Sequence, residues 1–318
     1  MDANFQELTA KAGKLNIDSK NPKYSTNWCD IPMEMRAECI KYMDLKTRMR
    51  LRRTSKTEKS LVQSAKKYFL KQFMVSVRLD RAIVTTIENG LLKECHEKPK
   101  NNERVMRNVV NILEHCEIDI FQFFTDEEND KQMQPICDFR IKDAPFRFET
   151  FYTSSNNAQI LKFFLGNCEG VEEVILNNRR MENVMDTLVE FPSVINAKLI
   201  LYLHLRHMDC QLFELFKKWI DNDAEIGKKL LFALRDKNDK PIELFASIFE
   251  DRIISKSNES VRIRTNNPSK HVILKCDISY PTASYYTCTI IPSDLRRLPR
   301  EWGWTVEFHS MDFDYYPN

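Results

Sequence analysis

The feature that most constrains the fold is an alternation of apolar and amphipathic segments from about residue 146 onward. Short apolar segments centre near Phe148, Ile175, Leu201 and Leu231, at separations of 27, 26 and 30 residues. The stretches between them, NAQILKFFLGN, MENVMDTLVEF and CQLFELFKKWI, place apolar residues at helical spacing. Strands that alternate with helices are typical of parallel sheets. We therefore expect a stack of parallel β–α units.

The length of these units suggests a repeat architecture. Strand–helix units of about 20–29 residues are typical of leucine-rich repeats. The segment VEEVILNN comes near that consensus, but its asparagines are out of register. We expect a leucine-rich-repeat-like strand–helix domain over residues 146–318 and leave the repeat family open. Stacks of this kind bind proteins along an extended face. The segments HVILKCDI, YYTCTIIP and WTVEFHS predict strands that close the stack.

Residues 71–145 combine both kinds of element. The segments FMVSVRL, AIVTTIE and LLKEC predict strands, and Asn89-Gly90 is a hairpin signal between the last two. A polar gap then precedes a predicted helix, RVMRNVVNILEHC. We expect an α+β connecting region here, which makes the fold class of the chain a mixture of α+β and α/β.

The beginning of the chain is different again. Residues 1–27 are polar and predict a flexible tail. The following stretch, MEMRAECIKYM, predicts a helix, and Pro32 suits its first turn because a missing N–H costs nothing there. The apolar residues of this helix are expected to share one face: Met35, Cys39, Ile40 and Met43.

Two more short helices are predicted. Asp44 can cap the segment LKTRMRLRR, and Ser55 with Glu58 forms a capping box that opens the third helix. Three short helices within roughly 40 residues cannot seal their own apolar surface. We expect the apolar stripe to be covered by a partner protein or by the chain's own second domain.

Charge is spread unevenly along the chain. The first 75 residues hold 16 Lys and Arg against eight Asp and Glu, a net +8, and since the whole chain carries +2 the remainder carries −6. Seven of these cations form a basic run: Lys46, Arg48, Arg50, Arg52, Arg53, Lys56 and Lys59. We expect a solvated helical face or a surface that steers an acidic partner. No aromatic residues interleave the run to stack on bases, so binding of nucleic acid is not expected.

No enzyme site is expected. The chain has six glycines, too dispersed for a phosphate-binding loop, and lacks the G-x-S-x-G and H-E-x-x-H motifs. His204, His207 and Cys210 have metal-ligand spacing, but the first two would point to opposite faces of a strand. His115-Cys116 has no third group to orient it. We expect no cofactor, no metal and no catalysis.

The cysteines indicate the compartment. Nine cysteines are scattered along the chain, mostly in apolar runs, and are expected to be reduced thiols. The first residues lack the apolar core of a secretory signal, and no run of 18 apolar residues exists. We expect no membrane association, and a location in the cytoplasm, the nucleus or both.

Residues 28–62, WCDIPMEMRAECIKYMDLKTRMRLRRTSKTEKSLV, resemble an F-box. The usual pattern has a Leu-Pro start, a Glu two residues later, spaced apolar positions and a basic tail that ends in Ser-Lys. The matching positions are Ile31-Pro32, Glu34, Met35, Ile40, Met43 and Leu51-Arg52-x-Thr54-Ser55-Lys56. Ile31 and Met43 replace the more usual leucines and remain apolar.

The second half carries another resemblance. The phrases ILKFFLGNCEGVEEVILNN and FPSVINAKLILYLHL, within about 146–290, resemble the FTH domain of the F-box A family, which is expanded in nematodes. The order of the two resemblances along the chain is the order in that family.

The resemblance implies a substrate adaptor. An F-box at 28–70 would dock a Skp-type linker subunit, which joins a cullin-RING ubiquitin ligase, and an FTH domain would bind the substrate protein. An exposed apolar stripe on a small helical unit suits helix-in-groove recognition. The expected linker contacts are Ile31, Pro32, Met35, Ile40, Met43, Leu51 and Val62. The alternative is a ligase-independent interaction scaffold or RNA-regulator cofactor that acts through the second domain.

Overall fold

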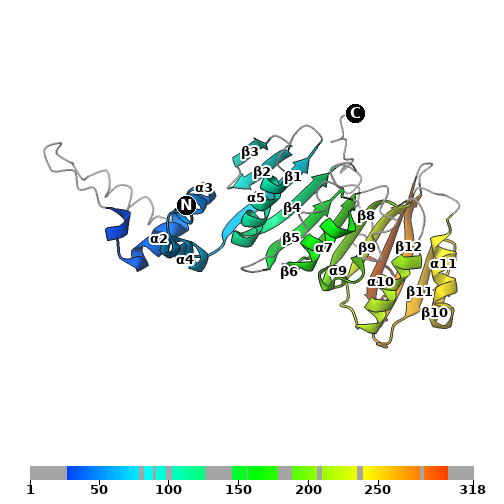
Figure 1. Cartoon of the computed structure of the whole chain (residues 1–318). Helices are drawn as coiled ribbons and strands as arrows, with labels where there is room; N and C mark the ends of the chain where they lie inside the picture. The colour runs from blue at the N-terminus through cyan, green and yellow to red at the C-terminus, as the bar shows by residue number, and fades with distance from the viewer. Residues whose placement is uncertain are drawn as a thin grey trace. The chain divides into compact units, whose positions relative to one another are not determined.

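The computed structural model describes residues 27–78, 82–88, 91–97, 102–125, 145–155, 157–177, 188–205, 210–234, 239–279 and 283–299. The chain divides into two compact units, Met1–Lys66 and Lys67–Asn318 (Figure 1). The predicted tail lies outside the described part, except for its last residue. Within that part, no helix is long and apolar enough to cross a membrane.

The first unit consists of a short 3-10 helix and three α-helices: η1 (Trp28–Asp30), α2 (Met33–Tyr42), α3 (Leu45–Leu51) and α4 (Lys56–Ser64). Pro32 immediately precedes α2. Asp44 Oδ1 accepts a hydrogen bond from the Thr47 amide at 2.7 Å, and Ser55 Oγ accepts one from the Glu58 amide at 3.1 Å. Each cap satisfies an amide that the first helical turn leaves unpaired. The three predicted helices are therefore confirmed.

The second unit is built on one mixed sheet, which among the described residues has 13 strands. Their order is β10-β11-β12-β13-β9-β8-β7-β5-β4-β1-β2-β3, and β6 pairs with β5 outside this path. The strands are β1 (Tyr68–Val77), β2 (Ala82–Glu88), β3 (Leu91–Glu97), β4 (Cys116–Thr125), β5 (Phe146–Thr153), β6 (Cys168–Glu169), β7 (Glu173–Asn177), β8 (Leu199–Leu205), β9 (Lys229–Leu234), β10 (Ile253–Lys256), β11 (Ser260–Arg264), β12 (Lys270–Ser279) and β13 (Ser284–Pro292). The helices are α5 (Asn102–His115), α7 (Ala158–Gly166), α9 (Pro192–Asn196), α10 (Cys210–Asp221), α11 (Pro241–Ile248) and η5 (Glu250–Arg252).

The middle of the sheet is parallel. The strands expected near Phe148, Ile175, Leu201 and Leu231 are β5, β7, β8 and β9, and each pairs in parallel with the next. Helices α7, α9 and α10 lie in the connections between them. The predicted order of parallel strands and helices is confirmed for this stretch. The helix expected over MENVMDTLVEF falls largely outside the described residues.

The sheet departs from a uniform repeat at both ends. Parallel pairing continues from β5 to β4 and β1, and the hairpin β2–β3 adds two antiparallel strands. After β9, strands β13, β12, β11 and β10 are all antiparallel. The expected boundary at residue 145 therefore does not separate two sheets, because β4 and β5 pair directly across it. A leucine-rich-repeat-like architecture stays a prediction.

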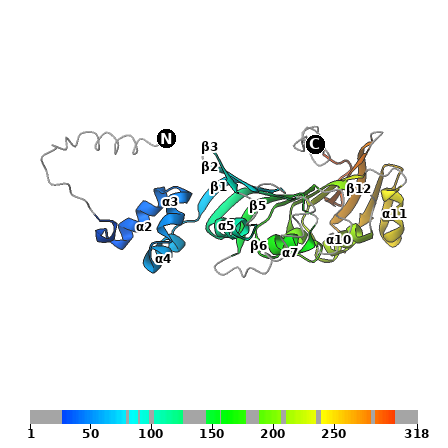
Figure 2. The same ribbon diagram turned by 45° about the horizontal axis from the view of Figure 1, so that its top comes forward.

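The helices of this unit pack on one face of the sheet. Figure 2 shows α5, α7, α10 and α11 on the same side. The ring of Phe164 on α7 lies 5.1 Å from that of Phe121 and 4.9 Å from that of Phe123, both on β4. Phe121 also stacks on Phe73 of β1 at 5.5 Å. Aromatic pairs at such distances add to the stabilisation from burial, so these rings join β1, β4 and α7 into one core.

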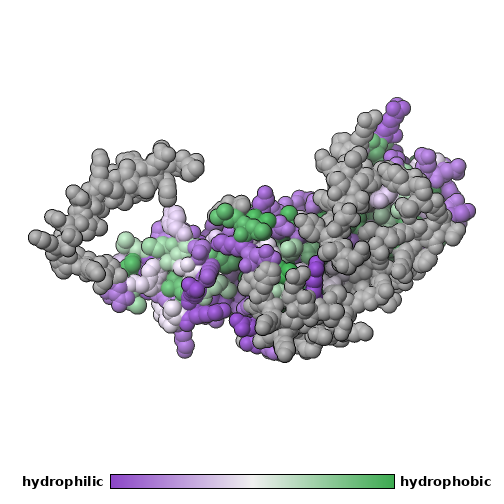
Figure 3. All heavy atoms as spheres, turned by 90° about the horizontal axis from the view of Figure 1, so that it is seen from above, coloured by the Kyte–Doolittle hydropathy of each residue, from purple (hydrophilic) through white to green (hydrophobic). Residues whose placement is uncertain are grey.

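Apolar side chains reach the surface at the β2–β3 end of the sheet. Leu91 and Leu92 are 67% and 65% exposed, and Figure 3 shows apolar residues gathered over this end. Strand β3 is the last in the order, so among the described residues no strand pairs with its outer edge. Unpaired main-chain groups at such an edge can accept an added strand.

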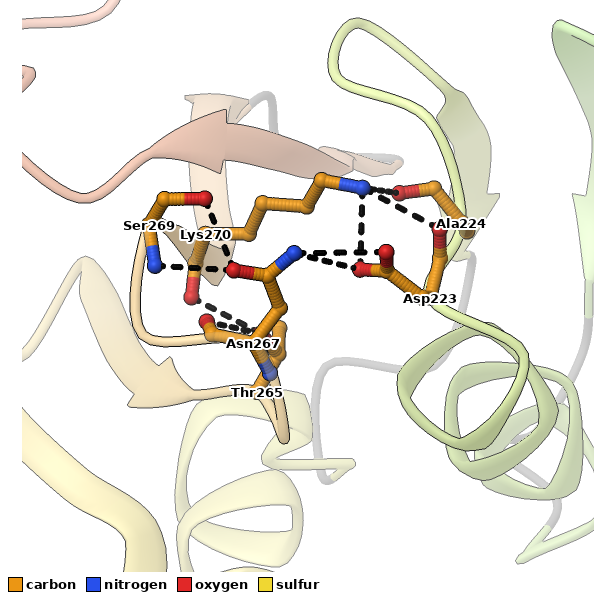
Figure 4. Close-up of polar contacts among 6 residues, drawn as sticks. All are labelled: Asp223, Ala224, Thr265, Asn267, Ser269 and Lys270. Atoms are coloured by element: carbon orange, nitrogen blue, oxygen red, sulfur yellow. Dashed lines mark hydrogen bonds and ion pairs between the residues drawn. The ribbon is translucent and has the colours of Figure 1, made fainter.

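A polar cluster ties the β11–β12 turn to the segment after α10 (Figure 4). Lys270 Nζ donates to Asp223 Oδ1 at 2.9 Å, and to the carbonyl oxygens of Asp223 and Ala224 at 3.1 Å. Asn267 Nδ2 donates to the two carboxylate oxygens of Asp223 at 3.0 and 3.2 Å. The hydrogen bond from Lys270, followed by that from Asn267, holds the pKa of Asp223 below its usual value. The cluster is therefore arranged around an ionised carboxylate.

The interactions of Asp223 with Lys270 and Asn267 should weaken at acidic pH. A carboxyl whose pKa is lowered by folding stabilises the fold above its unfolded pKa, and the stabilisation is lost as the pH falls through the folded pKa. We expect the wild type to be more stable to urea than Asp223→Asn at about pH 6, and the difference to vanish near pH 2. Asp251→Asn is the control. The ion pair of that carboxylate is long, with Arg252 Nε at 4.0 Å, so its removal should change the stability little at either pH. A difference that stayed constant down to the acid limit would contradict the assignment.

Candidate docking surface of the N-terminal unit

The first unit has a small core of its own. Ile40 of α2 packs with Leu61 and Val62 of α4, and all three are buried. Half-buried apolar residues surround them: Trp28, Ala37, Met43, Leu51 and Ala65. The three helices therefore seal part of the apolar surface that was expected to need outside cover.

Helix α2 has two different faces. At about 3.6 residues per turn, Cys39 and Tyr42 lie within roughly 40° of Met35, whereas Ile40 lies about 140° away. Accordingly, Met35 is 59% and Tyr42 80% exposed, Cys39 is exposed, and Ile40 is fully buried. We call Met35, Cys39 and Tyr42 the outer stripe. The prediction of one face holding Met35, Cys39, Ile40 and Met43 was wrong, because a spacing of five residues places side chains on opposite sides of a helix.

The seven expected linker contacts fall into three groups. Two are exposed: Pro32 and Met35. Three are half-buried: Ile31, Met43 and Leu51. Two are buried in the core of the unit: Ile40 and Val62. Ile40 is fully covered and Val62 is 8% exposed, so both pack in the core of the unit, and their contact with a linker stays a prediction.

Two exposed apolar residues of α2 escaped the sequence analysis. Met33 is 51% exposed at the start of the helix, and Tyr42 is the most exposed large apolar residue of the unit among those described. The sequence could have indicated Tyr42, because it follows Met35 by seven residues and Cys39 by three, and such spacing places all three on one face of a helix. Beside the outer stripe, Lys41 Nζ donates to Glu38 Oε2 at 2.6 Å, and this hydrogen bond raises the pKa of Lys41.

Arg48 joins the ends of the three helices. Its side chain is buried, and it donates to the carbonyl oxygens of Lys41 and Lys66 at 2.8 Å and of Met43 at 3.2 Å. These carbonyls stand at the C-terminal end of α2 and just beyond α4, where helix carbonyls lack partners within the helix. The guanidinium of Arg48, a residue of α3, therefore donates hydrogen bonds to carbonyl groups at the ends of α2 and α4. Its expected place on a solvated face was wrong.

A buried ion pair joins α2 to α4. Arg36 Nη1 donates to Glu58 Oε1, and both side chains are largely covered. Glu58 therefore does not complete the predicted capping box with its carboxylate, although its amide is capped by Ser55. Tertiary pairing prevails because a buried carboxylate must be matched by a charge.

The rest of the basic run is on the surface. Lys46, Arg50, Arg53, Lys56 and Lys59 are exposed, and Arg52 is half-buried. Five of the seven cations are thus available to a partner. The exposed surface of this unit therefore includes these cations as well as the outer stripe.

Among the described residues, no group of three or more His, Cys, Asp or Glu could hold a metal. His207 and the side chains of His204 and Cys210 lie outside the described part. Cys116, the first residue of β4, is fully buried. Burial raises the pKa of the Cys168 thiol to about 12, which keeps it protonated and a poor nucleophile near neutral pH.

Comparison with known proteins identifies the first unit. The family model of the F-box domain matches residues 28–70, which include all three α-helices, the outer stripe and the exposed cations. The predicted F-box is confirmed over the expected range. No curated protein matches the chain.

Proposed function

We propose that this chain is a substrate-recognition adaptor of a Skp-cullin-F-box E3 ubiquitin ligase. The observation that carries the proposal is the F-box match over residues 28–70, in a compact helical unit with an apolar stripe exposed on α2. F-box domains in general dock Skp-type linkers of cullin-RING ligases. The adaptor raises the effective concentration of its target near the ubiquitin-charged enzyme.

The outer stripe is proposed as the main contact for the linker. Met35 and Tyr42 project from one side of α2 with Cys39 between them. An amphipathic helix that presents residues at such spacing fits a hydrophobic groove. A few such anchors dominate the affinity of a protein interface. Pro32, exposed just before α2, lies near the same side, whereas the exposed Met33 lies about 160° around the helix from Met35 and is not part of the stripe.

The second unit is proposed to hold the target protein. Its support is the resemblance of residues 146–290 to the FTH domain, together with the parallel strand–helix order of β5 to β9. The exposed leucines of β3, the last strand in the order of the described sheet, offer one place where an extended target segment could add a strand. We propose a binding role without catalysis, in the cytoplasm, the nucleus or both.

A direct binding measurement tests the adaptor role. We expect the purified full-length chain to bind a purified Skp-type linker with micromolar or tighter affinity by calorimetry. A chain without residues 1–66 should lose this binding and keep the circular dichroism of its sheet. Absence of binding by the intact chain would refute the role. It would favour the alternative, a ligase-independent scaffold or RNA-regulator cofactor acting through the second unit.

A further inference from the structure

Five cations on α3, on α4 and between them are exposed, and we call them the cationic face. They are Lys46, Arg50, Arg53, Lys56 and Lys59. None of them takes part in an ion pair with another described residue, whereas Arg36 pairs with Glu58 and Lys41 with Glu38 in the same unit. The cationic face therefore presents its full charge to the surroundings.

The sequence supplies few carboxylates near these cations. From the start of α3 to the end of the unit the only acidic residue is Glu58, and its carboxylate is buried against Arg36. Lys46, Arg50 and Arg53 follow each other by four and three residues, which places them on one side of α3 and its last turn. The Arg53 amide still bonds the Arg50 carbonyl at 3.0 Å, so the helical spacing extends to that residue.

Holding these charges together works against the stability of the unit. Like charges at positions i and i+4 repel, and a surface of one sign destabilises the compact state. The outer stripe and the small core explain folding and docking without them. Binding of an oppositely charged partner to the cationic face would offset this repulsion and would explain why the cations are grouped.

We propose that the cationic face is a landing surface for an acidic region of the linker subunit, and that it sets how fast the linker associates. This inference rests on the proposed adaptor function and adds the charge of the partner to it. Complementary charge steers encounter and can raise association rates by about 10–1,000-fold at low salt. The outer stripe then sets how slowly the complex dissociates, because apolar anchors act after contact.

The composition of the face favours a protein partner over nucleic acid. No aromatic residue occurs between Leu45 and Lys67, so no ring is available to stack on bases of a single strand. The cationic face offers charge, which an acidic protein surface matches. Duplex DNA, which needs charge alone, is the alternative that the test must separate.

Association kinetics at varied salt test the proposal. We compare the full-length wild type with a variant carrying Lys46→Gln, Arg50→Gln and Arg53→Gln, using surface-immobilised linker. At about 20 mM salt the variant should associate roughly tenfold more slowly, and at about 500 mM, where the screening length falls to a few Å, the two rates should agree within about twofold. Equal dissociation rates and equal high-salt affinity would show that the variant is folded.

A matched control removes three exposed cations from the second unit by Lys162→Gln, Lys256→Gln and Arg264→Gln. It should keep the wild-type association rate. An equal slowing in the control, or a salt-independent wild-type rate, overturns the inference while leaving the adaptor role intact. A second probe, labelled poly-glutamate, should bind the wild type and not the triple variant. The poly-glutamate measurement tests whether the cationic face binds an acidic polypeptide even if the linker does not bind at all. Tighter binding of duplex DNA than of poly-glutamate also overturns the inference.

Discussion

Replacing Met35 and Tyr42 by aspartate should abolish linker binding and leave the first unit folded. Both side chains are more than half exposed, so charge there does not disturb the core around Ile40. In the complex, each aspartate would lie unpaired in an apolar groove, which costs several kcal/mol per charge. We expect the affinity in calorimetry to fall by at least roughly a hundredfold, a change of about 2.7 kcal/mol.

Two controls make this result specific. Met35→Leu with Tyr42→Phe keeps the apolar area and should bind within a few-fold of the wild type. The loss caused by aspartate should also persist at high salt, unlike the effect of the cationic face, because it comes from desolvation and not from long-range attraction. Retained binding by the aspartate variant would mean that the linker contacts another surface of the unit.

Arg48→Leu should destabilise the first unit strongly. The substitution removes three hydrogen bonds and leaves the carbonyls of Lys41, Met43 and Lys66 without this donor. A hydrogen bond to a charged group contributes about 1.5–3 kcal/mol, and because these three are only partly buried we expect a total loss of roughly 3 kcal/mol in the opening free energy of α2–α4. Hydrogen exchange of their amides in the full-length chain measures this loss.

The control for Arg48 lies two residues along the same helix. Arg50 is exposed, and Arg50→Leu should change the same exchange rates by no more than about 0.5 kcal/mol. Arg48→Lys separates charge from geometry, because an ammonium cannot reach three carbonyls in the planar arrangement of a guanidinium. Equal exchange in the wild type and Arg48→Leu would show that the carbonyls find other donors.

The elements of the first unit could be predicted because their signals are local. Asp44 and Ser55 cap helices through amides three residues away, and such contacts can be read from spacing alone. The faces of the helices could not be assigned in the same way. Met35 and Ile40 are both apolar, and only the position of α4 decides that Ile40 turns inward.

The charged residues show the same limit. Arg48 and Arg50 look equivalent in the sequence, yet one is buried among carbonyls and the other is exposed. The difference depends on where α2 and α4 end relative to α3, which is a tertiary property. In the second unit, the spacing of β5 to β9 predicted parallel strands, but the pairing of β4 with β5 joins residues 30 apart and left no local signal.

The junction between the units determines how the chain can be divided for experiments. The first unit ends at Lys66, whose carbonyl is held by Arg48, and β1 begins at Tyr68. A recombinant fragment cut at residue 70, where the F-box match ends, would carry three residues of β1 away from the sheet. Leu70 is fully buried in the intact chain. In this fragment it would be exposed to solvent at the carboxyl terminus and would promote self-association. A cut directly after Lys66 leaves both halves with their own cores.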